Sequence, residues 1–558
     1  HRRQVAVEDV EVDEWSGRFE FEGRHGGRAA GRQGGRAAGR QGGRAASCGE
    51  QGSVAIYPRP QPAAPMRPLF GFLLLFITTS SLGAQPAPDR FAAVRASIQA
   101  AITDSGIPSI AVAVAKGGRV LWQEGFGWAD REGRVPATEH TMYSLASISK
   151  PITATGLMLL VERGRVQLDR PANDYLGRGR ITGLAGDASG ATVRRIANHT
   201  SGLPLHYMFY YDGAADVVPS MDEAISRYGI TVYPPGSTYE YSNLGFGVLD
   251  HIIERTSGMT YADFMRSEVF LPLGMTRSSI HVGPGLEPFA AVRYDPQGRR
   301  VPMYDFDHRG ASAVYTSAHD LLRFGMFHLK NRLPGMKRIL ADSTLDAMHT
   351  SVHGIPNLEY GIGWRIQNDE NGLRRVSHSG GMPGVATLLG LYPAEDLAVV
   401  VLANTTSNAT VGRIASEIVA ALVPRYADTL RVRRARATPP RPPAWNTPAA
   451  LSGQWTGTVR TWQGTQPFTL TFQPDGDVVT SLGNQPRALL WDTAWLGDSV
   501  FVGRFAGSMP TDDARLHRHT IWLKLTLRGG TLSGMATAQT VPPDTVFYAR
   551  SAYAELRR

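Results

Sequence analysis

The chain has 558 residues, of which 42% are hydrophobic, so it is long enough for more than one domain with a large buried core. Its formal charge of +9 comes from a diffuse arginine excess, and the composition therefore does not indicate nucleic-acid binding. The fifteen histidines are scattered, Cys48 is the only cysteine, and no H-E-x-x-H or Cys/His cluster occurs. We therefore predict no metal, no other cofactor and no disulfide.

The first part of the chain divides into two segments that we do not expect in the mature protein. Residues 1–65 begin with His1 and carry a Gly-Gly-Arg-Ala-Ala-Gly-Arg-Gln repeat with almost no apolar periodicity, so we expect them to be disordered and not native. Residues 66–84 combine one positive charge, the apolar run 69–77 and small residues ending at Ala84, which is typical of a secretory signal peptide. This run is too short to span a bilayer. We predict a soluble protein exported to the periplasm or the exterior, with no stable membrane span.

Residues 85–430 are predicted to form the main domain, of the α+β class. A helix is expected over 90–104, followed by a hairpin with strands at 110–115 and 119–123. Two strands and a closing helix return near the end of this region, at 385–391, 397–403 and 411–422. This order predicts an antiparallel sheet assembled from both ends of the region, flanked by helices and interrupted by an all-helical insert.

Ser147-Ile148-Ser149-Lys150 places a hydroxyl and an amine three residues apart where a helix is expected to begin. Pro151 lacks an N–H and is tolerated in a first helical turn, so it fixes the helix start near Ser147. Residues three apart share one helix face, and the free N–H groups of a helix start favour negative charge near the serine oxygen. The pattern therefore predicts an activated nucleophile. The alternative is a serine N-cap followed by a solvated lysine.

Tyr241-Ser242-Asn243 lies in a loop-like stretch before an amphipathic helix expected over 244–256. Side chains two apart in an extended segment point the same way, so one loop can supply a proton acceptor and an amide to one cleft. The alternative is a buried tyrosine with a helix-capping asparagine. Nearby, His199 is interpreted as a turn residue beside Gly202. The aromatic run 206–211 either lines the cleft or serves loop packing.

His378-Ser379-Gly380-Gly381 is placed between two predicted strands, at 373–377 and 385–391. Glycines at such a point allow a substrate to approach the backbone closely. A second H-x-G, His308-Arg309-Gly310, competes for the same role. It lies in a polar run in which we expect no strand on either side, so we favour His378.

Beyond residue 430 the composition changes to a linker rich in proline and arginine, residues 431–447. Residues 448–558 then show short alternating runs bounded by glycine and aspartate, which predict a small antiparallel β-barrel. The expected strands lie at 455–462, 468–472, 478–482, 500–505, 520–527 and 546–550. This barrel has no recognisable catalytic set, and we expect it to shape the cleft, mediate assembly or bind a partner.

The order S-x-x-K, Y-x-N and H-x-G, with flanking segments such as His199-Thr200-Ser201-Gly202-Leu203-Pro204, resembles the serine β-lactamase and penicillin-binding protein superfamily. Within it, the chain resembles the class C-like branch of esterases and D-aminopeptidases, over residues 91–423. The C-terminal barrel is similar to lipocalin-like domains that follow some members.

The resemblance implies a role for each motif residue. Ser147 is the acylated nucleophile, Lys150 a base or proton shuttle, and Tyr241 the general base in deacylation. Asn243, His378 and Gly380 bind the substrate, and the backbone N–H groups of Ser147 and Gly381 form the oxyanion hole. The residues alone leave open whether Lys150 or Tyr241 takes the serine proton, because the two groups form a coupled pair.

His378 stands where β-lactamases of this superfamily usually carry lysine, and histidine is mostly neutral at pH 7. A fixed cation for a substrate carboxylate is therefore missing. We expect an exported serine hydrolase of small esters, or of amides and peptides that lack this carboxylate. The alternatives are a β-lactamase or D,D-carboxypeptidase acting on β-lactams or cell-wall peptides, and a receptor or scaffold without turnover. The oligomeric state is not predicted.

Overall fold

A computed structural model of the chain describes residues 89–214, 217–351, 353–355, 358–368, 373–428, 445–497, 499–541 and 546–558. The upstream segment, the predicted signal peptide and residues 431–444 of the predicted linker lie outside the described residues. From Arg90 onward the chain forms one compact unit. Among the helices described, none has both the length and the apolar character that a membrane span requires.

A nine-stranded antiparallel sheet organises the larger, N-terminal region of this unit, in the order β11-β12-β13-β14-β15-β16-β1-β2-β3. Its early strands are β1 (Ser109–Lys116), β2 (Arg119–Asp130) and β3 (Val135–Pro136). Its late strands are β11 (His353–Ile355), β12 (Leu358–Tyr360), β13 (Arg365–Asn368), β14 (Arg374–Met382), β15 (Val385–Tyr392) and β16 (Leu397–Ala403). Because β1 pairs with β16, both ends of the region meet in one sheet, as predicted.

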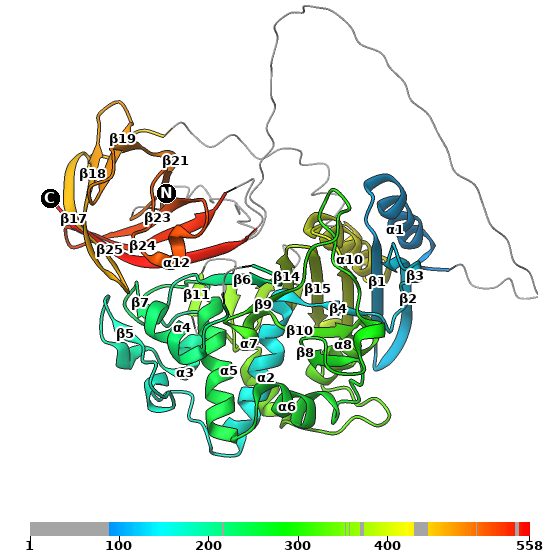
Figure 1. Ribbon diagram of the computed structural model, residues 1–558. Coiled ribbons are helices and arrows are strands. Elements are labelled where there is room, and N and C mark those ends of the chain that lie inside the picture. The colour runs from blue at the N-terminus through cyan, green and yellow to red at the C-terminus, as the bar shows by residue number, and fades with distance from the viewer. Residues whose placement is uncertain are drawn as a thin grey trace, which may run out of the picture. The chain divides into compact units, whose positions relative to one another are not determined.

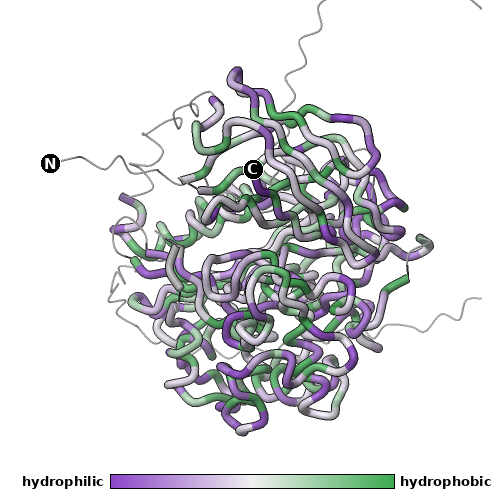
Figure 2. Tube along the Cα trace, turned by 90° about the vertical axis from the view of Figure 1, so that its left-hand side faces the viewer, coloured by the Kyte–Doolittle hydropathy of each residue, from purple (hydrophilic) through white to green (hydrophobic). Residues whose placement is uncertain are grey.

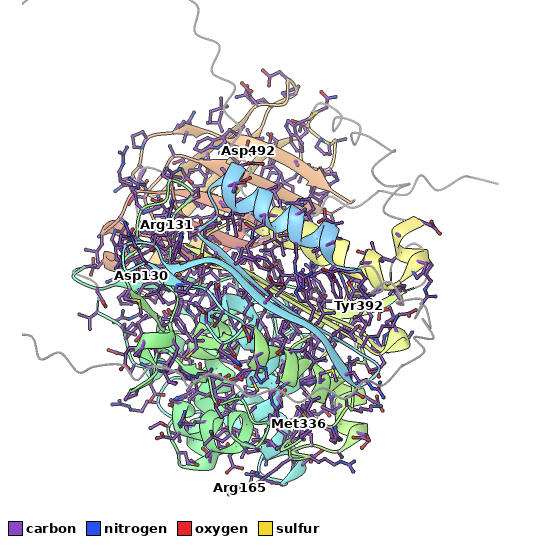
Figure 3. The ribbon with its side chains drawn as sticks, turned by 90° about the vertical axis from the view of Figure 1, so that its right-hand side faces the viewer. Asp130, Arg131, Arg165, Met336, Tyr392 and Asp492 are labelled. Atoms are coloured by element: carbon purple, nitrogen blue, oxygen red, sulfur yellow. The ribbon has the colours of Figure 1, made fainter. Side chains whose placement is uncertain are left out.

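Helices cover both faces of this sheet, which explains why its central strands are apolar throughout rather than alternating. Ile110, Val112 and Val114 of β1 pack in one core with helices α1 (Ala92–Ser105) and α10 (Asn408–Leu422). Figure 3 shows α1, in blue, lying against this face, and labels Tyr392 of the same core. The opposite face contacts α8 (Ala318–His328).

The helical insert packs α2 (Ser149–Glu162) against α5 (Asn243–Ser257), and Figure 1 shows both helices near the centre of this region. The other helices are α3 (Val193–Ala197), α4 (Met221–Tyr228), α6 (Tyr261–Phe264), the π-helix Met265–Phe270, α7 (Arg309–Ser312) and α9 (Asp342–Met348). Two small sheets complete the region, one of β4 (Met142–Ser144), β10 (Val314–Ser317) and β8 (Ser278–Ile280), the other of β5 (Thr182–Gly183) and β7 (Ile230–Thr231).

The C-terminal region is a nearly closed antiparallel barrel, which confirms the predicted fold class. Its strands are β17 (Gly453–Thr461), β18 (Gly464–Phe472), β19 (Val478–Leu482), β20 (Ala488–Leu489), β21 (Trp491–Leu496), β22 (Val500–Phe505), β23 (His519–Arg528), β24 (Thr531–Thr540) and β25 (Tyr548–Arg557), with the short helix α12 (Asp512–Arg515). Burial alternates along strands such as β19 and β22. Figure 2, which is coloured by hydropathy, shows hydrophobic and hydrophilic residues interspersed along the chain. One face of these two strands therefore fills the barrel.

The aromatic run 206–211 becomes a strand that joins the two regions. Strand β6 (Tyr207–Tyr211) pairs with β25 of the barrel and with β9 (Tyr304–Phe306). Met208 and Tyr210 of β6 are buried in the core of the barrel. The run therefore serves packing between the regions, and the barrel core includes residues from the first half of the chain.

Candidate active site

Ser147 lies in a one-turn 3₁₀ helix, η1 (Ala146–Ile148), that leads directly into α2. This start agrees with the position predicted from Pro151. Ala146 has a φ of 49°, in the left-handed region that non-glycine residues rarely adopt. Backbone held in such a sparsely populated conformation is found most often at active sites and ligand-binding segments. Ser147 as a whole residue is 8% exposed, so it is buried but not fully closed off from solvent.

Lys150 is fully buried, one turn beyond Ser147. Its Nζ donates hydrogen bonds to Ser147 Oγ at 3.1 Å, to Asn243 Oδ1 at 2.7 Å and to the Ala311 carbonyl at 3.3 Å. The alternative of a solvated lysine therefore does not hold. Burial disfavours the charged form of an amine, whereas hydrogen bonds to three acceptor oxygens favour it.

Tyr241 and Asn243 both face Lys150, because Ser242 between them is extended with φ −133° and ψ 114°. The Lys150 ammonium lies over the Tyr241 ring, 4.6 Å from its centroid. Ser242, rather than Asn243, caps α5, since its Oγ accepts the Gly245 N–H at 3.0 Å. The asparagine amide is thus available to the site, as the Y-x-N spacing predicted.

His199 has a larger role in the site than the sequence indicated. Its φ of 61° agrees with the predicted turn. Its ring lies 4.4 Å from the Tyr241 ring, and its Nδ1 accepts the Ser242 N–H at 3.1 Å. Burial, followed by the charges of Lys150 and His378, holds the pKa of His199 well below its usual value. His199 is therefore a neutral side chain that supports the Tyr-Ser-Asn segment.

The His378-Ser379-Gly380-Gly381 segment lies inside strand β14, not between two strands as expected. β14 pairs with β15 over this segment, whereas β13 pairs only with residues 374–377 of β14. The segment packs closely on η1, because a Cβ at Gly380 would lie 2.1 Å from the Leu145 carbonyl oxygen. No side chain larger than that of glycine fits at position 380. This close packing brings the backbone of β14 beside the backbone of Ser147.

His378 is a neutral side chain with both ring nitrogens hydrogen-bonded. Nδ1 donates to the Ser379 carbonyl at 2.7 Å, so Nε2 accepts from the Tyr360 hydroxyl at 2.8 Å. Burial and the Lys150 charge lower the pKa of His378 to about 3. The H-x-G segment therefore supplies no cation at neutral pH.

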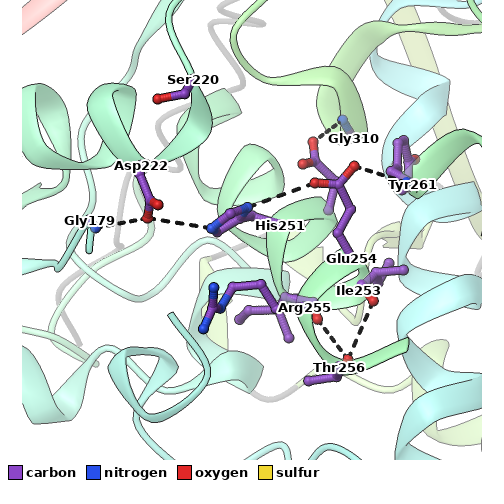
Figure 4. A network of polar contacts seen from close by, with 12 residues as sticks. Gly179, Ser220, Asp222, His251, Ile253, Glu254, Arg255, Thr256, Tyr261 and Gly310 are labelled. Atoms are coloured by element: carbon purple, nitrogen blue, oxygen red, sulfur yellow. Dashed lines mark hydrogen bonds and ion pairs between the residues drawn. The ribbon is translucent and has the colours of Figure 1, made fainter. Parts of the chain in front are cut away.

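The competing His308-Arg309-Gly310 segment lies on a different wall of the site. Contrary to expectation, strands β9 and β10 flank it at a distance of a few residues. His308 is fully buried and its Nδ1 bonds Asp307 Oδ1 at 2.6 Å. Helix α7 follows and presents the Ala311 carbonyl to Lys150. Figure 4 shows the Gly310 amide bonded to a carboxylate of α5, which is Asp250 at 2.5 Å.

The contributions of Tyr360 and Ala311 were missed from the sequence. Tyr360 begins the segment Tyr360-Gly361-Ile362-Gly363-Trp364, which resembles the superfamily in the same way as the flanking segment His199 to Pro204. This resemblance was the signal that could have found Tyr360. Ala311 contributes a backbone carbonyl, for which no side-chain pattern exists. A separate cavity of about 490 Å³, near β3 and the start of α8, shares no residue with the site. In the described part of the chain, no three His, Cys, Asp or Glu residues cluster as metal ligands.

The antiparallel sheet with its helical insert, and the S-x-x-K, Y-x-N and H-x-G segments gathered around one buried lysine, define a protein of the β-lactamase/transpeptidase-like superfamily. Residues 94–423 match the Beta-lactamase family, and the chain belongs to that family.

Two curated relatives illustrate the extent of the sequence match. Penicillin-binding protein 4* of Bacillus subtilis (strain 168) is 28% identical over 318 residues, which cover 52% of this chain and 67% of that protein. Protein flp of Staphylococcus aureus (strain N315) is 25% identical over 312 residues, which cover 54% of this chain and 60% of that protein. The match therefore leaves a third or more of each relative uncovered.

Two solved structures share the fold. The octameric penicillin-binding protein homologue from Pyrococcus abyssi is similar with a TM-score of 0.53 and 21% identity, over 83% of this chain and 99% of that chain. A class C β-lactamase is similar with a TM-score of 0.53 and 21% identity, over 60% of this chain and 96% of that chain. At these identities the likeness establishes the fold alone.

Proposed function

We propose that the protein is a serine hydrolase that forms an acyl-enzyme on Ser147. The observation that carries this proposal is the 3.1 Å hydrogen bond between Ser147 Oγ and the fully buried amine of Lys150. A serine hydroxyl is a weak nucleophile at neutral pH and requires an adjacent base. Membership of the Beta-lactamase family supports the same chemistry.

In the proposed reaction, Lys150 has given up one of its three N–H protons before Ser147 Oγ attacks the substrate carbonyl carbon. The proton of Oγ then passes to this uncharged amine, or to Tyr241 in its phenolate form. The N–H groups of Ser147 and Gly381 stabilise the oxyanion. The C–O or C–N bond then breaks, and the leaving group takes up the proton. A water molecule then attacks the acyl carbon while its proton passes to Tyr241 in its phenolate form. This proton is returned to Ser147 Oγ as the bond between Oγ and the acyl carbon breaks, which releases the acid and restores the serine hydroxyl. Asn243 orients the substrate and also accepts a hydrogen bond from Lys150.

The proposed substrates are esters, or amides and peptides, that lack a carboxylate near the scissile bond. Neutral His378 supports this class, because binding a carboxylate beside it would leave that charge without a cation. β-Lactams and cell-wall peptides are the second candidate class, favoured by the fold shared with a class C β-lactamase. The predicted signal peptide further leads us to propose that the activity is exported.

We expect a higher kcat/KM for a short-chain aryl ester than for a chromogenic cephalosporin. The preference is expected to persist from pH 5 to pH 8, because a pKa of about 3 keeps His378 neutral over that range. The two substrates are compared by initial rates with the same enzyme preparation, and the Ser147→Ala variant gives the background. Faster turnover of the cephalosporin would contradict the assignment of substrate class.

A further inference from the structure

The barrel contacts the loop that carries Tyr241. This loop, residues 230–241, is tied to the preceding turn by backbone hydrogen bonds, including Glu240 N–H to the His199 carbonyl at 2.8 Å. On its other side Val232 and Tyr233 pack in one buried cluster with Met535 and Tyr553 of the barrel. The Tyr233 hydroxyl also donates to the Lys524 carbonyl of β23 at 2.9 Å.

An ion pair joins the barrel to the residue next to Tyr241. Lys524 Nζ lies 2.6 Å from Glu240 Oε2. The Glu240 side chain is only 6% exposed, whereas that of Lys524 is 30% exposed. In the described part of the chain, Glu240 forms no other ion pair. A nearly buried carboxylate is thus neutralised by a cation from a strand that lies 284 residues further along the chain.

Removing one partner of a buried ion pair costs far more than removing both, because it leaves an uncompensated charge away from water. Without Lys524, the Glu240 carboxylate is driven towards solvent. Tyr241 follows Glu240 directly, and Ser242 and Asn243 continue the same segment, so movement of Glu240 changes the placement of Tyr241 against Lys150. A misplacement of about 1 Å at a reacting group can lower a rate by about a hundredfold.

We propose that Lys524 of the barrel is a positioning residue for the hydrolase, because it neutralises the nearly buried Glu240 carboxylate and so keeps the adjoining Tyr241 in place in the active site. This inference rests on the proposed function of Tyr241. Of the three roles expected for the barrel, the inference assigns it that of shaping the cleft.

Four variants of the full chain test the proposal with an aryl ester: Lys524→Met, Lys524→Arg, Glu240→Gln and the double variant Glu240→Gln/Lys524→Met. We expect Lys524→Met to lower kcat at least tenfold with a change in KM of less than threefold. Lys524→Arg keeps the cation and is expected to stay within threefold of the wild-type kcat. The double variant removes both charges and is expected to recover most of the kcat that Lys524→Met loses. The kcat of Glu240→Gln alone is expected to be close to that of the double variant.

Lys116→Met is the matched control, because Lys116 is also 30% exposed and pairs with a glutamate, Glu395, at 3.4 Å in the first region. Its kcat is expected to be unchanged. Wild-type kcat in Lys524→Met, or a loss of kcat that Glu240→Gln does not relieve, would overturn the proposal. If Lys524→Met fails to fold, the double variant Glu240→Gln/Lys524→Met decides the question. If the double variant folds but its kcat is tenfold below that of the wild type, the proposal is overturned as well.

Ser147→Ala distinguishes this inference from the proposed function on which it rests. If Ser147→Ala is inactive and Lys524→Met is fully active, only the positioning role fails. If Ser147→Ala retains the wild-type rate, the proposed function fails and the positioning role fails with it.

Discussion

Replacing Lys150 with methionine is expected to lower kcat/KM for an aryl ester by between about a hundredfold and ten-thousandfold, the usual contribution of a positioned base. Methionine has a similar length but cannot accept the Ser147 proton. The effect is expected mainly in kcat, because the amine contacts the serine, Asn243 and Ala311 inside the protein. Initial rates over a range of ester concentrations measure both constants.

Lys150→Arg tests whether the amine acts as a base or only as a charge. Arginine keeps the cation but does not lose its proton in proteins, so this variant is expected to be as inactive as Lys150→Met. Circular dichroism and thermal unfolding establish whether each variant is folded. A folded Lys150→Arg variant with wild-type kcat would contradict the base role of Lys150.

Gly380→Ala is expected to lower both activity and stability. The added Cβ would lie 2.1 Å from the Leu145 carbonyl oxygen and 2.3 Å from Thr387 Oγ1, so β14 must move away from η1. Overpacking of this kind costs about 1–3 kcal/mol of stability. The movement is also expected to separate the Gly381 N–H from that of Ser147, the two donors of the proposed oxyanion hole, and loss of one such donor lowers kcat by about a hundredfold or more. Denaturant unfolding and ester kinetics measure the two effects.

Gly412→Ala is the matched control for this substitution. Gly412 lies within α10, and a Cβ there would meet no atom within 4 Å. Alanine in a helix is favoured over glycine by about 0.5–1 kcal/mol, so this variant is expected to be slightly more stable and fully active. Wild-type stability and activity in Gly380→Ala would show that β14 does not press on η1 as described.

Local sequence patterns predicted the parts of the site that lie on one element. The pairing of Ser147 with Lys150 follows from helix periodicity and the position of Pro151. The common orientation of Tyr241 and Asn243 follows from the alternation of an extended segment. The two-ended sheet was predictable because apolar strands appeared at both ends of the region.

Features that depend on distant contacts were not predictable from the sequence. No local pattern links Glu240 to Lys524, or Tyr360 to His378. Strand β24 was missed because alanine, serine and glycine replace the β-branched and aromatic residues typical of strands. The His-Ser-Gly-Gly segment was expected between two strands, with glycines that allow close approach to the backbone. In the structure β14 runs through the segment, and it is the packing on η1 that requires a glycine there.

The central claim is that Ser147 carries the acyl group during turnover. The most direct measurement is mass spectrometry of the full chain after reaction with a fluorophosphonate, followed by peptide mapping. We predict one adduct per chain, located on Ser147 and absent from the Ser147→Ala variant. An adduct on another residue, or the same adduct in Ser147→Ala, would contradict the account.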